Sequence, residues 1–347
     1  MNIDNEYLRR FLAPRGFTMP GGGNVWFPPG AHDVVETLEF GGPDITVRGQ
    51  GQGGVTLRNG AWESYGQSVL RWAGHADEPM LRAHGCTRFD IGSLGLRVDS
   101  ADGGYASEAL VLSAHNDDGL IGGTQGPKVS RVSFVAPRDQ INDSIGIHIT
   151  GTDYNDQVDR VLIDSCAMSG IGTGVKQTSQ QAVATRIVGS EFSCWHRNVE
   201  ILDSSAIIES CLMTERRWAS GTSDFIAVHL GLNPYSPPNN GQSAQDCHIL
   251  RNAFEMHTGR FIVIDAPTSF PQSIAGNKFL LQNQAPGSVM TILDSINAGT
   301  VTVTGSNYNS PTGGGGLIYQ HGEGRLLHDE SNFKRRWMGD LIVVRKN

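Results

Sequence analysis

Ile249-Leu-Arg-Asn-Ala-Phe254 and Ile274-Ala-Gly-Asn-Lys-Phe279 share one pattern: an apolar residue, two residues, a Ser or Asn, one residue, and a second apolar residue. Successive copies of this pattern begin 20 to 42 residues apart. Four further copies keep the polar residue, and they begin at Leu162, Ile187, Ile207 and Val303. Two looser copies, in which another residue replaces the polar one, begin at Ile91 and Val129. Such a period indicates a repeat architecture, in which each copy is one supersecondary unit.

A second short segment with alternating apolar residues follows each copy. Val175–Gln177 and Val199–Ile201 are examples, and no apolar stripe of helical period lies between Val25 and Gly324. Sandwiches and barrels also have short strands, but they do not require one residue type at one corner of each period. A solenoid favours one residue type at that corner, because equivalent positions of successive coils stack about 4.8 Å apart. The Ser and Asn side chains at these positions can then hydrogen-bond along the axis. The sequence therefore predicts an all-β fold, a parallel β-helix of about eight to ten coils with short capping termini.

The composition of the 347 residues agrees with a turn-rich fold and excludes several classes of protein. There are 44 glycines, and charged residues make up only 18% of the chain. A hydrophobic content of 38% argues against disorder, and no stretch approaches the length of about 18 apolar residues that spans a membrane. The net charge of −8 gives no support for a nucleic-acid partner. Five widely spaced cysteines indicate buried thiols rather than disulfides or a zinc site.

The run Gly23-Asn-Val-Trp-Phe-Pro-Pro-Gly30, followed by Ile45-Thr-Val-Arg-Gly-Gln-Gly-Gln-Gly53 and Val55–Arg58, carries a family resemblance. It resembles the opening of right-handed β-helix proteins of the pectate-lyase-like superfamily, and is most similar to bacteriophage tailspike and related virion fibre proteins. The resemblance implies a right-handed single-stranded β-helix, a homotrimer and contact with a host surface glycan. The Ala-rich helix that usually precedes this opening is absent.

The two ends of the chain differ from the repeat region. We expect residues 1–22 to be an N-terminal cap or attachment segment, residues 23–320 to form the β-helix, and residues 321–347 to be a C-terminal cap or subunit-docking segment. The first residues, Met1–Phe11, contain no apolar core of a secretory signal, so we expect a virion protein assembled in the host cytoplasm.

Side chains suited to glycan binding recur in the turns and second strands of successive periods. Indole faces pack against sugars, and charged groups hold hydroxyls or acidic substituents. The predicted carbohydrate-binding residues form two sets. The set in the turns consists of Trp195, Arg197, Arg217, Trp218 and His257, and the set on the outward side of the second strands consists of His148, Lys176 and Glu200. Packing of Trp195 and Trp218 against a neighbouring subunit, or ordinary surface packing, is the alternative for this set.

Glycan cleavage needs two carboxyl groups within about 5 to 10 Å of each other. Glu215 and Glu255 follow the repeat by similar offsets in neighbouring periods and are the predicted catalytic pair, with Glu191 and Glu209 as the other possible pair. The residue sets of polygalacturonase-type hydrolases and of pectate lyases are not found. We expect no cofactor and no metal site, since acidic runs such as Asp117-Asp118 are good turn formers and lack calcium-loop spacing.

Three functions are open on this sequence. The favoured one is a phage virion appendage, a spike, fibre or decoration subunit that contacts host surface polysaccharide and other virion proteins without membrane insertion. A polysaccharide lyase or glycoside hydrolase that uses a carboxylate pair is the alternative, and a purely structural virion connector is the third.

Overall fold

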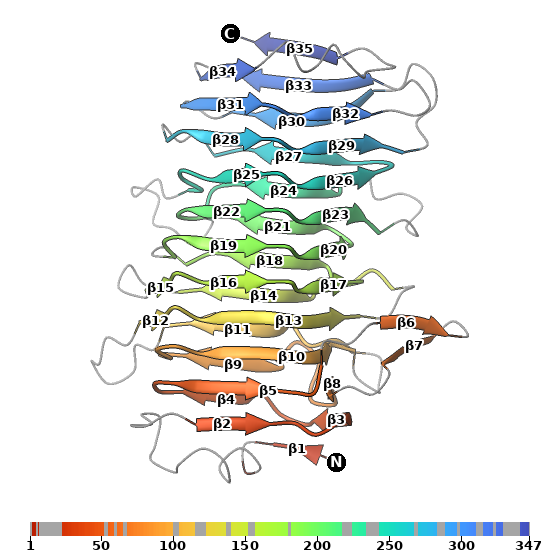
Figure 1. Ribbon diagram of the computed structural model, residues 1–347, viewed down its shortest axis with the longest axis vertical. Helices are drawn as coiled ribbons and strands as arrows, with labels where there is room; N and C mark the ends of the chain where they lie inside the picture. The colour runs from red at the N-terminus through yellow and green to blue at the C-terminus, as the bar shows by residue number, and fades with distance from the viewer. Residues whose placement is uncertain are drawn as a thin grey trace.

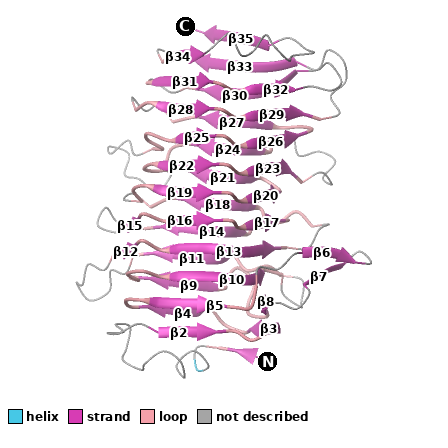
Figure 2. Cartoon of the chain, in the orientation of Figure 1, coloured by secondary structure: helices cyan, strands magenta, loops and turns pink. Residues whose placement is uncertain are grey.

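The protein is a tall stack of short strands, and its N-terminus and C-terminus lie at opposite ends of the stack (Figure 1). The computed structural model describes residues 2–4, 6, 23–51, 55–58, 61–64, 68–99, 104–114, 123–136, 140–151, 157–179, 182–216, 224–233, 243–266, 270–282, 289–296, 299–309, 315–321, 324–328 and 341–346. Strands joined by loops and turns make up these residues (Figure 2). Among them, no helix has the length and apolar character needed to cross a bilayer.

Each coil of the stack contributes three short segments, and equivalent segments of successive coils pair in parallel. The first two segments meet at a bend and together build a 20-stranded sheet, which we divide into facet 1 and facet 2. The third segment of each coil belongs to an 11-stranded sheet, called facet 3. The strands of facet 1 run in one direction across the front of Figure 1, those of facet 3 return behind them, and the chain rises from N to C. The tube is therefore a right-handed parallel β-helix.

Facets 1 and 2 share the long strands β10 (Asp90–Arg97) and β13 (Lys128–Val135), which cross the bend. The other strands of facet 1 are β2 (Gly23–Trp26), β5 (Ile45–Arg48), β16 (Leu162–Asp164), β19 (Thr185–Val188), β22 (Ala206–Glu209), β25 (His248–Leu250), β28 (Gln272–Ala275), β31 (Thr300–Thr304) and β34 (Arg325–His328). Those of facet 2 are β1 (Asn2–Ile3), β3 (Gly30–Val34), β8 (Ser68–Trp72), β17 (Ala167–Ser169), β20 (Glu191–Cys194), β23 (Leu212–Glu215), β26 (Ala253–Met256), β29 (Lys278–Leu281) and β32 (Asn307–Asn309).

Facet 3 holds one strand per coil. Its strands are β4 (Leu38–Gly41), β9 (Leu81–His84), β11 (Glu108–Ser113), β14 (Ile145–Thr150), β18 (Thr173–Gln177), β21 (Arg197–Ile201), β24 (Ile226–Leu230), β27 (Arg260–Ile264), β30 (Val289–Ser295), β33 (Gly315–His321) and β35 (Leu341–Lys346). Two small sheets lie outside the facets: β12 (Thr124–Gln125) pairs in parallel with β15 (Val158–Asp159), and β6 (Val55–Arg58) forms an antiparallel hairpin with β7 (Ala61–Ser64).

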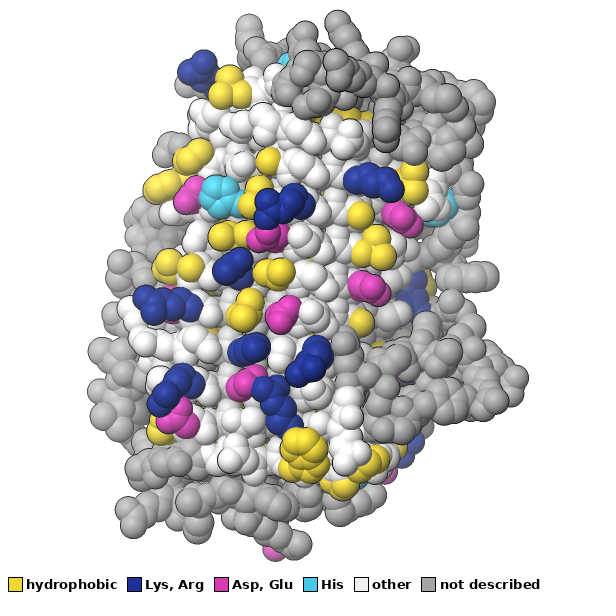
Figure 3. Space-filling view, viewed as in Figure 1, with side chains coloured by type: hydrophobic (Ala, Val, Ile, Leu, Met, Phe, Trp, Pro, Cys, Tyr) yellow, Lys and Arg dark blue, Asp and Glu magenta, His cyan; other side chains and the backbone are white. Residues whose placement is uncertain are grey.

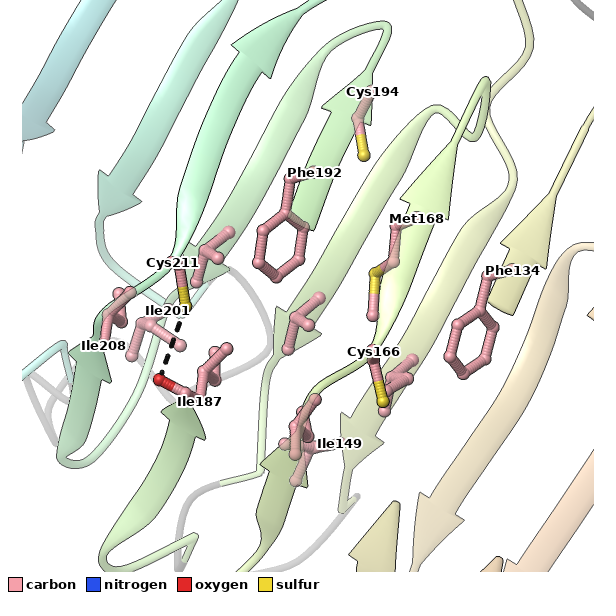
Figure 4. Packing of buried hydrophobic residues seen from close by; sticks show 14 of the residues in the cluster. Phe134, Ile149, Cys166, Met168, Ile187, Phe192, Cys194, Ile201, Ile208 and Cys211 are labelled. Atoms are coloured by element: carbon pink, nitrogen blue, oxygen red, sulfur yellow. Dashed lines mark hydrogen bonds between the residues drawn. The ribbon is translucent and has the colours of Figure 1, made fainter. Parts of the chain in front are cut away.

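The core fills the tube with columns of like residues. From β2 to β31, one column on facet 1 contains only Val and Ile, all of them buried: Val25, Val47, Ile91, Val129, Ile163, Ile187, Ile208, Ile249, Ile274 and Val303. Larger side chains line facet 2, where Phe254, Phe279 and Tyr308 stack with centroids 4.9 and 5.1 Å apart. Figure 4 shows the same interior lower in the tube. Because β-branched side chains pack well on a pleated surface, such columns stabilise the sheets.

The register of the strands corrects the sequence interpretation in two coils. Ile163 pairs with Ile187, and Ile208 pairs with Ile249, so the inward copies begin one residue later than the predicted starts Leu162 and Ile207. The inward corner residues of these coils are then Cys166 and Cys211. The sequence pattern is displaced by one residue in these coils because a serine, Ser165 or Ser210, directly precedes each of the two cysteines and matches the polar position of the repeat.

The bend between facets 1 and 2 uses one left-handed residue per coil. Its φ angles lie between +54° and +66°, at Ser93, Arg131, Ser165, Gly189, Ser210, Arg251, Gly276 and Gly305. A single residue in this region turns an extended chain sharply, at a cost of about 1 kcal/mol or more when it carries a side chain. Only three of these eight residues are glycines, so the stacking of coils stabilises a strained turn in the other five.

Polar side chains at the inward corner hydrogen-bond along the tube axis, as the repeat predicts. The Asn277 Oδ1 atom accepts from the Asn252 N–H at 2.8 Å, and the Asn252 Oδ1 atom accepts from the Cys211 N–H at 2.9 Å. Two coils lower, Ser190 Oγ accepts from the Cys166 N–H at 3.1 Å. These bonds satisfy main-chain donors where the bend interrupts the ladder.

Candidate functional site

Facet 3 carries a row of polar side chains on its outer surface. His148, Lys176 and Glu200 occupy equivalent positions of β14, β18 and β21, and His229 of β24 continues the column. Contacts extend the row at both ends. We define the facet 3 row as Glu108, His148, Lys176, Glu200, His229 and Asp265.

Ion pairs and hydrogen bonds connect most neighbours in the facet 3 row. The Lys176 Nζ atom lies 3.3 Å from Glu200 Oε2, and His229 Nδ1 lies 3.0 Å from Glu200 Oε1. The other ring nitrogen of His229 lies 2.8 Å from Asp265 Oδ2. Farther down the tube, His148 Nδ1 lies 3.2 Å from Glu108 Oε1. Each contact joins adjacent coils, so the row is held in place by the stacking itself.

The charges of the facet 3 row are set by burial and pairing. Burial opposes ionisation of Glu200, but the hydrogen bond from His229 and the charge of Lys176 outweigh it and lower the pKa of Glu200 to about 2. Burial also disfavours the charged form of His229, whereas Asp265 and Glu200 favour it, and the pKa of His229 is raised. The row therefore combines a carboxylate and an imidazolium at mildly acidic pH, below the ordinary histidine pKa of 6.5.

The turns that join facets 2 and 3 hold the other predicted set. Trp195 is only 3% exposed, and the guanidinium carbon of Arg216 lies 5.4 Å from the centre of its ring. Arg216 donates through Nη1 to the Ser169 hydroxyl at 3.0 Å. This buried cation–π pair stabilises the corner. Because Arg216 covers the ring and the side chain is buried, Trp195 lacks the open ring face that stacking against a sugar requires.

The predicted catalytic carboxylates lie on the adjacent strands β23 and β26, but not at equivalent positions. Thr214 is the residue in register with Glu255, so Glu215 is displaced by one residue. Glu215 accepts hydrogen bonds from the His257 N–H at 2.9 Å and from the Thr258 N–H and hydroxyl at 2.9 and 3.0 Å. Glu255 accepts from the Gln282 side chain at 3.3 Å. Glu215 thus anchors the turn of the next coil.

The remaining predicted residues are dispersed. Arg197 lies at the start of β21 on facet 3, and His257 lies in the turn that Glu215 holds. Arg217 and Trp218 lie outside the described residues, as does the acidic run Asp117-Asp118. Of the other possible carboxylate pair, Glu209 belongs to facet 1, where its carboxylate pairs with Arg186 and Arg251, and Glu191 belongs to facet 2. Within the described ranges, no cluster of three His, Cys, Asp or Glu side chains is arranged to hold a metal ion.

The face formed by facets 1 and 2 has a mixed character. Basic, acidic and hydrophobic side chains are interspersed over it, with no field of a single sign on the described surface in view (Figure 3). Apolar residues take outward positions of facet 1 in several coils, among them Leu162, Val188, Ile207 and Leu250. They alternate with the ion pair Arg186–Glu209. This composition is common at surfaces that pack against other proteins.

Comparison with known proteins finds similarity among solved structures. No protein-family model matches the chain, and no curated protein matches it. Among solved structures, the chain is similar to the tailspike protein gp49 of the Acinetobacter baumannii bacteriophage Fri1, a capsular polysaccharide depolymerase. The identity is 12% and the TM-score 0.39, over 88% of this chain and 56% of the tailspike chain. The chain thus spans little more than half the length of that tailspike, and the assignment of the β-helix rests on the strand register described above.

Three members of the facet 3 row were absent from the sequence interpretation: Glu108, His229 and Asp265. Glu108 begins β11 and meets His148 of the next coil. His229 follows the predicted segment Ile226–Val228 at the next outward position, so extending the column by one more coil would have found it. Asp265 follows β27 and meets His229 only because the coils stack. No local sequence signal marks it.

Proposed function

We propose that the chain is a subunit of a phage virion appendage, a β-helical spike, fibre or decoration protein, whose facet 3 contacts host surface polysaccharide. The facet 3 row is the observation that carries this proposal. It offers charged donors and acceptors in alternation along the tube, on strands whose geometry is set before a ligand arrives. A rigid array of this kind loses little conformational entropy when it binds the hydroxyls of an extended glycan. The tailspike-like opening of the sequence supports the virion location.

We further propose that three copies associate side by side, with other virion proteins at one end of the assembly. The mixed apolar and charged surface of facets 1 and 2 supports packing between tubes. Three parallel tubes would form a closed ring of heterologous contacts. Sedimentation equilibrium tests this: a trimer has three times the chain mass of 37.4 kDa, and a monomer at micromolar concentration contradicts the proposal.

Cleavage of the bound glycan is the second candidate, favoured by the position of Glu215 and Glu255 on adjacent strands. The contacts of Glu215 with His257 and Thr258 support an anchoring role for that carboxylate instead. Incubation with purified capsule and lipopolysaccharide glycans, followed by reducing-end and unsaturated-sugar assays, separates a binder from an enzyme. Cleavage that survives in the Glu215→Gln and Glu255→Gln double variant excludes this pair.

The binding surface is tested on the same glycan panel. The double variant Lys176→Gln and His229→Gln removes two donors of the facet 3 row. Arg88→Gln is the matched control, because Arg88 pairs with Asp44 in the turn before β10, outside the three facets. We expect at least a tenfold loss of affinity in the double variant, because charge-assisted hydrogen bonds are lost, and wild-type affinity in the control. Equal affinities of the two variants contradict glycan contact through facet 3. If no glycan of the panel binds the wild-type protein, a structural connector becomes the better interpretation.

A further inference from the structure

Arg197 differs from Arg82 and Arg260, which also belong to facet 3, in its partners. Its Nη1 atom donates to two main-chain carbonyls, that of His196 at 2.8 Å and that of Asp224 at 2.7 Å. Its Nε atom is buried and has no hydrogen-bond partner, and none of the described carboxylates lies within ion-pair distance of its guanidinium. Arg82 and Arg260, by contrast, pair with Glu39 and Asp294. Arg197 is therefore a cation held by neutral acceptors only.

Burial makes this arrangement costly for the free protein. Desolvation lowers the pKa of Arg197, with the nearby charge of Arg260 acting in the same direction against the acidic neighbours Glu200, Asp224 and Asp265. The carboxylates of Glu200 and Asp265 are already bonded to His229. A half-buried guanidinium that has acidic neighbours but no ion-paired carboxylate gains more from an incoming anion than a solvated, paired one does.

The surroundings of Arg197 are suited to a ligand that lies along the tube. Arg197 and Arg260 are both in register with Ile226, one on each side, so their main chains lie about 9.6 Å apart, two strand spacings. Ile226 between them is only 2% exposed. The next outward column holds Glu200 and His229, which belong to the facet 3 row. Anion recognition at Arg197 would therefore be continuous with the proposed glycan-binding surface.

We propose that Arg197, with Arg260 two strands away, is an anion subsite that binds the carboxylate of an acidic sugar, so that the glycan recognised by facet 3 is an acidic polysaccharide. This inference rests on the proposed function for the polysaccharide and on the contacts of Arg197 for the anion. The guanidinium donors that these two carbonyls leave unused can bond a carboxylate, and a lysine cannot reproduce their planar arrangement.

Affinity electrophoresis with two named polymers tests the proposal. Polygalacturonate supplies a carboxylate on each sugar, and neutral dextran supplies none. We expect wild-type protein to bind polygalacturonate in preference to dextran, the variant Arg197→Gln to bind it at least tenfold more weakly, and Arg197→Lys to be intermediate. Arg88→Gln is the matched control, because Arg88 is a paired arginine in the turn before β10, outside the three facets. Circular dichroism verifies that each variant is folded.

A second readout separates this inference from the proposed function. Free galacturonate is expected to raise the melting temperature of wild-type protein and of Arg88→Gln, but not of Arg197→Gln. Stabilisation by galacturonate without binding to either polymer refutes the polysaccharide function and leaves the anion subsite standing. Polymer binding that is the same for polygalacturonate and dextran, or unchanged in Arg197→Gln, overturns the anion subsite and leaves the function standing. Binding of dextran sulfate alone overturns the assignment to a carboxylate.

Discussion

Replacing Glu200 with glutamine should remove a pH-dependent part of the stability of the β-helix. The Glu200 side chain is 14% exposed and bridges Lys176 and His229 of the two neighbouring strands. Its pKa falls from an ordinary value of 4.5 to about 2 in the folded protein. At about 1.4 kcal/mol per pKa unit, the difference corresponds to at most about 3 kcal/mol of stability.

The sign of the pH dependence follows from that lowered pKa. A carboxylate with a depressed folded pKa stabilises the protein above its unfolded value of 4.5, and the contribution is lost as the pH falls toward 2. The raised pKa of His229 has the opposite sense, so its contribution is complete below its unfolded value of 6.5 and is lost as the pH rises through the folded value. The bridge between the two residues therefore contributes most between about pH 4.5 and pH 6.5.

Guanidinium unfolding of wild-type protein and Glu200→Gln at pH 6 and at pH 3 measures the effect. We expect the variant to be less stable by about 2 to 3 kcal/mol at pH 6 and the difference to shrink at pH 3. Glu255→Gln is the control, since the Glu255 carboxylate accepts one long hydrogen bond from the Gln282 amide, and its loss should cost about 1 kcal/mol or less. A difference between wild type and Glu200→Gln that is as large at pH 3 as at pH 6 refutes the reasoning.

Three further predictions concern the interior of the tube. Asn277→Ala leaves the Asn252 N–H without its acceptor and should cost about 1 to 3 kcal/mol in chemical unfolding, whereas the exposed Asn307→Ala should change stability by less than about 0.5 kcal/mol. Phe279→Ala opens a cavity in the aromatic stack and should cost about 3 to 5 kcal/mol, and a loss no larger than that of Phe270→Ala, whose ring is 46% exposed, contradicts the packing. Burial raises the pKa of every cysteine thiol to about 11 or 12, so a thiol reagent at pH 8 should label the native protein slowly and label all five after denaturation: Cys86, Cys166, Cys194, Cys211 and Cys247.

The difference between Trp195 and His148 shows which site residues a repeat can locate. His148 was placed correctly on an outward column because strand alternation and the coil period together define that column. Trp195 lies in a turn, where neither rule applies, and its ring packs under Arg216 instead of facing solvent. The repeat period predicts the strands better than it predicts the direction of a side chain in a turn.

The sequence by itself determined the parallel β-helix, the position of the strands that form facet 3 and the inward ladder of Ser and Asn. These features recur in several coils along the tube, so weak local signals add up over the copies. Tertiary structure alone decided the register of the coils at Cys166 and Cys211, the anchoring of Glu215 and the contact of Asp265 with His229. Each of these depends on how one coil sits on the next, and side chains 36 to 42 residues apart meet there through stacking rather than through any pattern in their own segments.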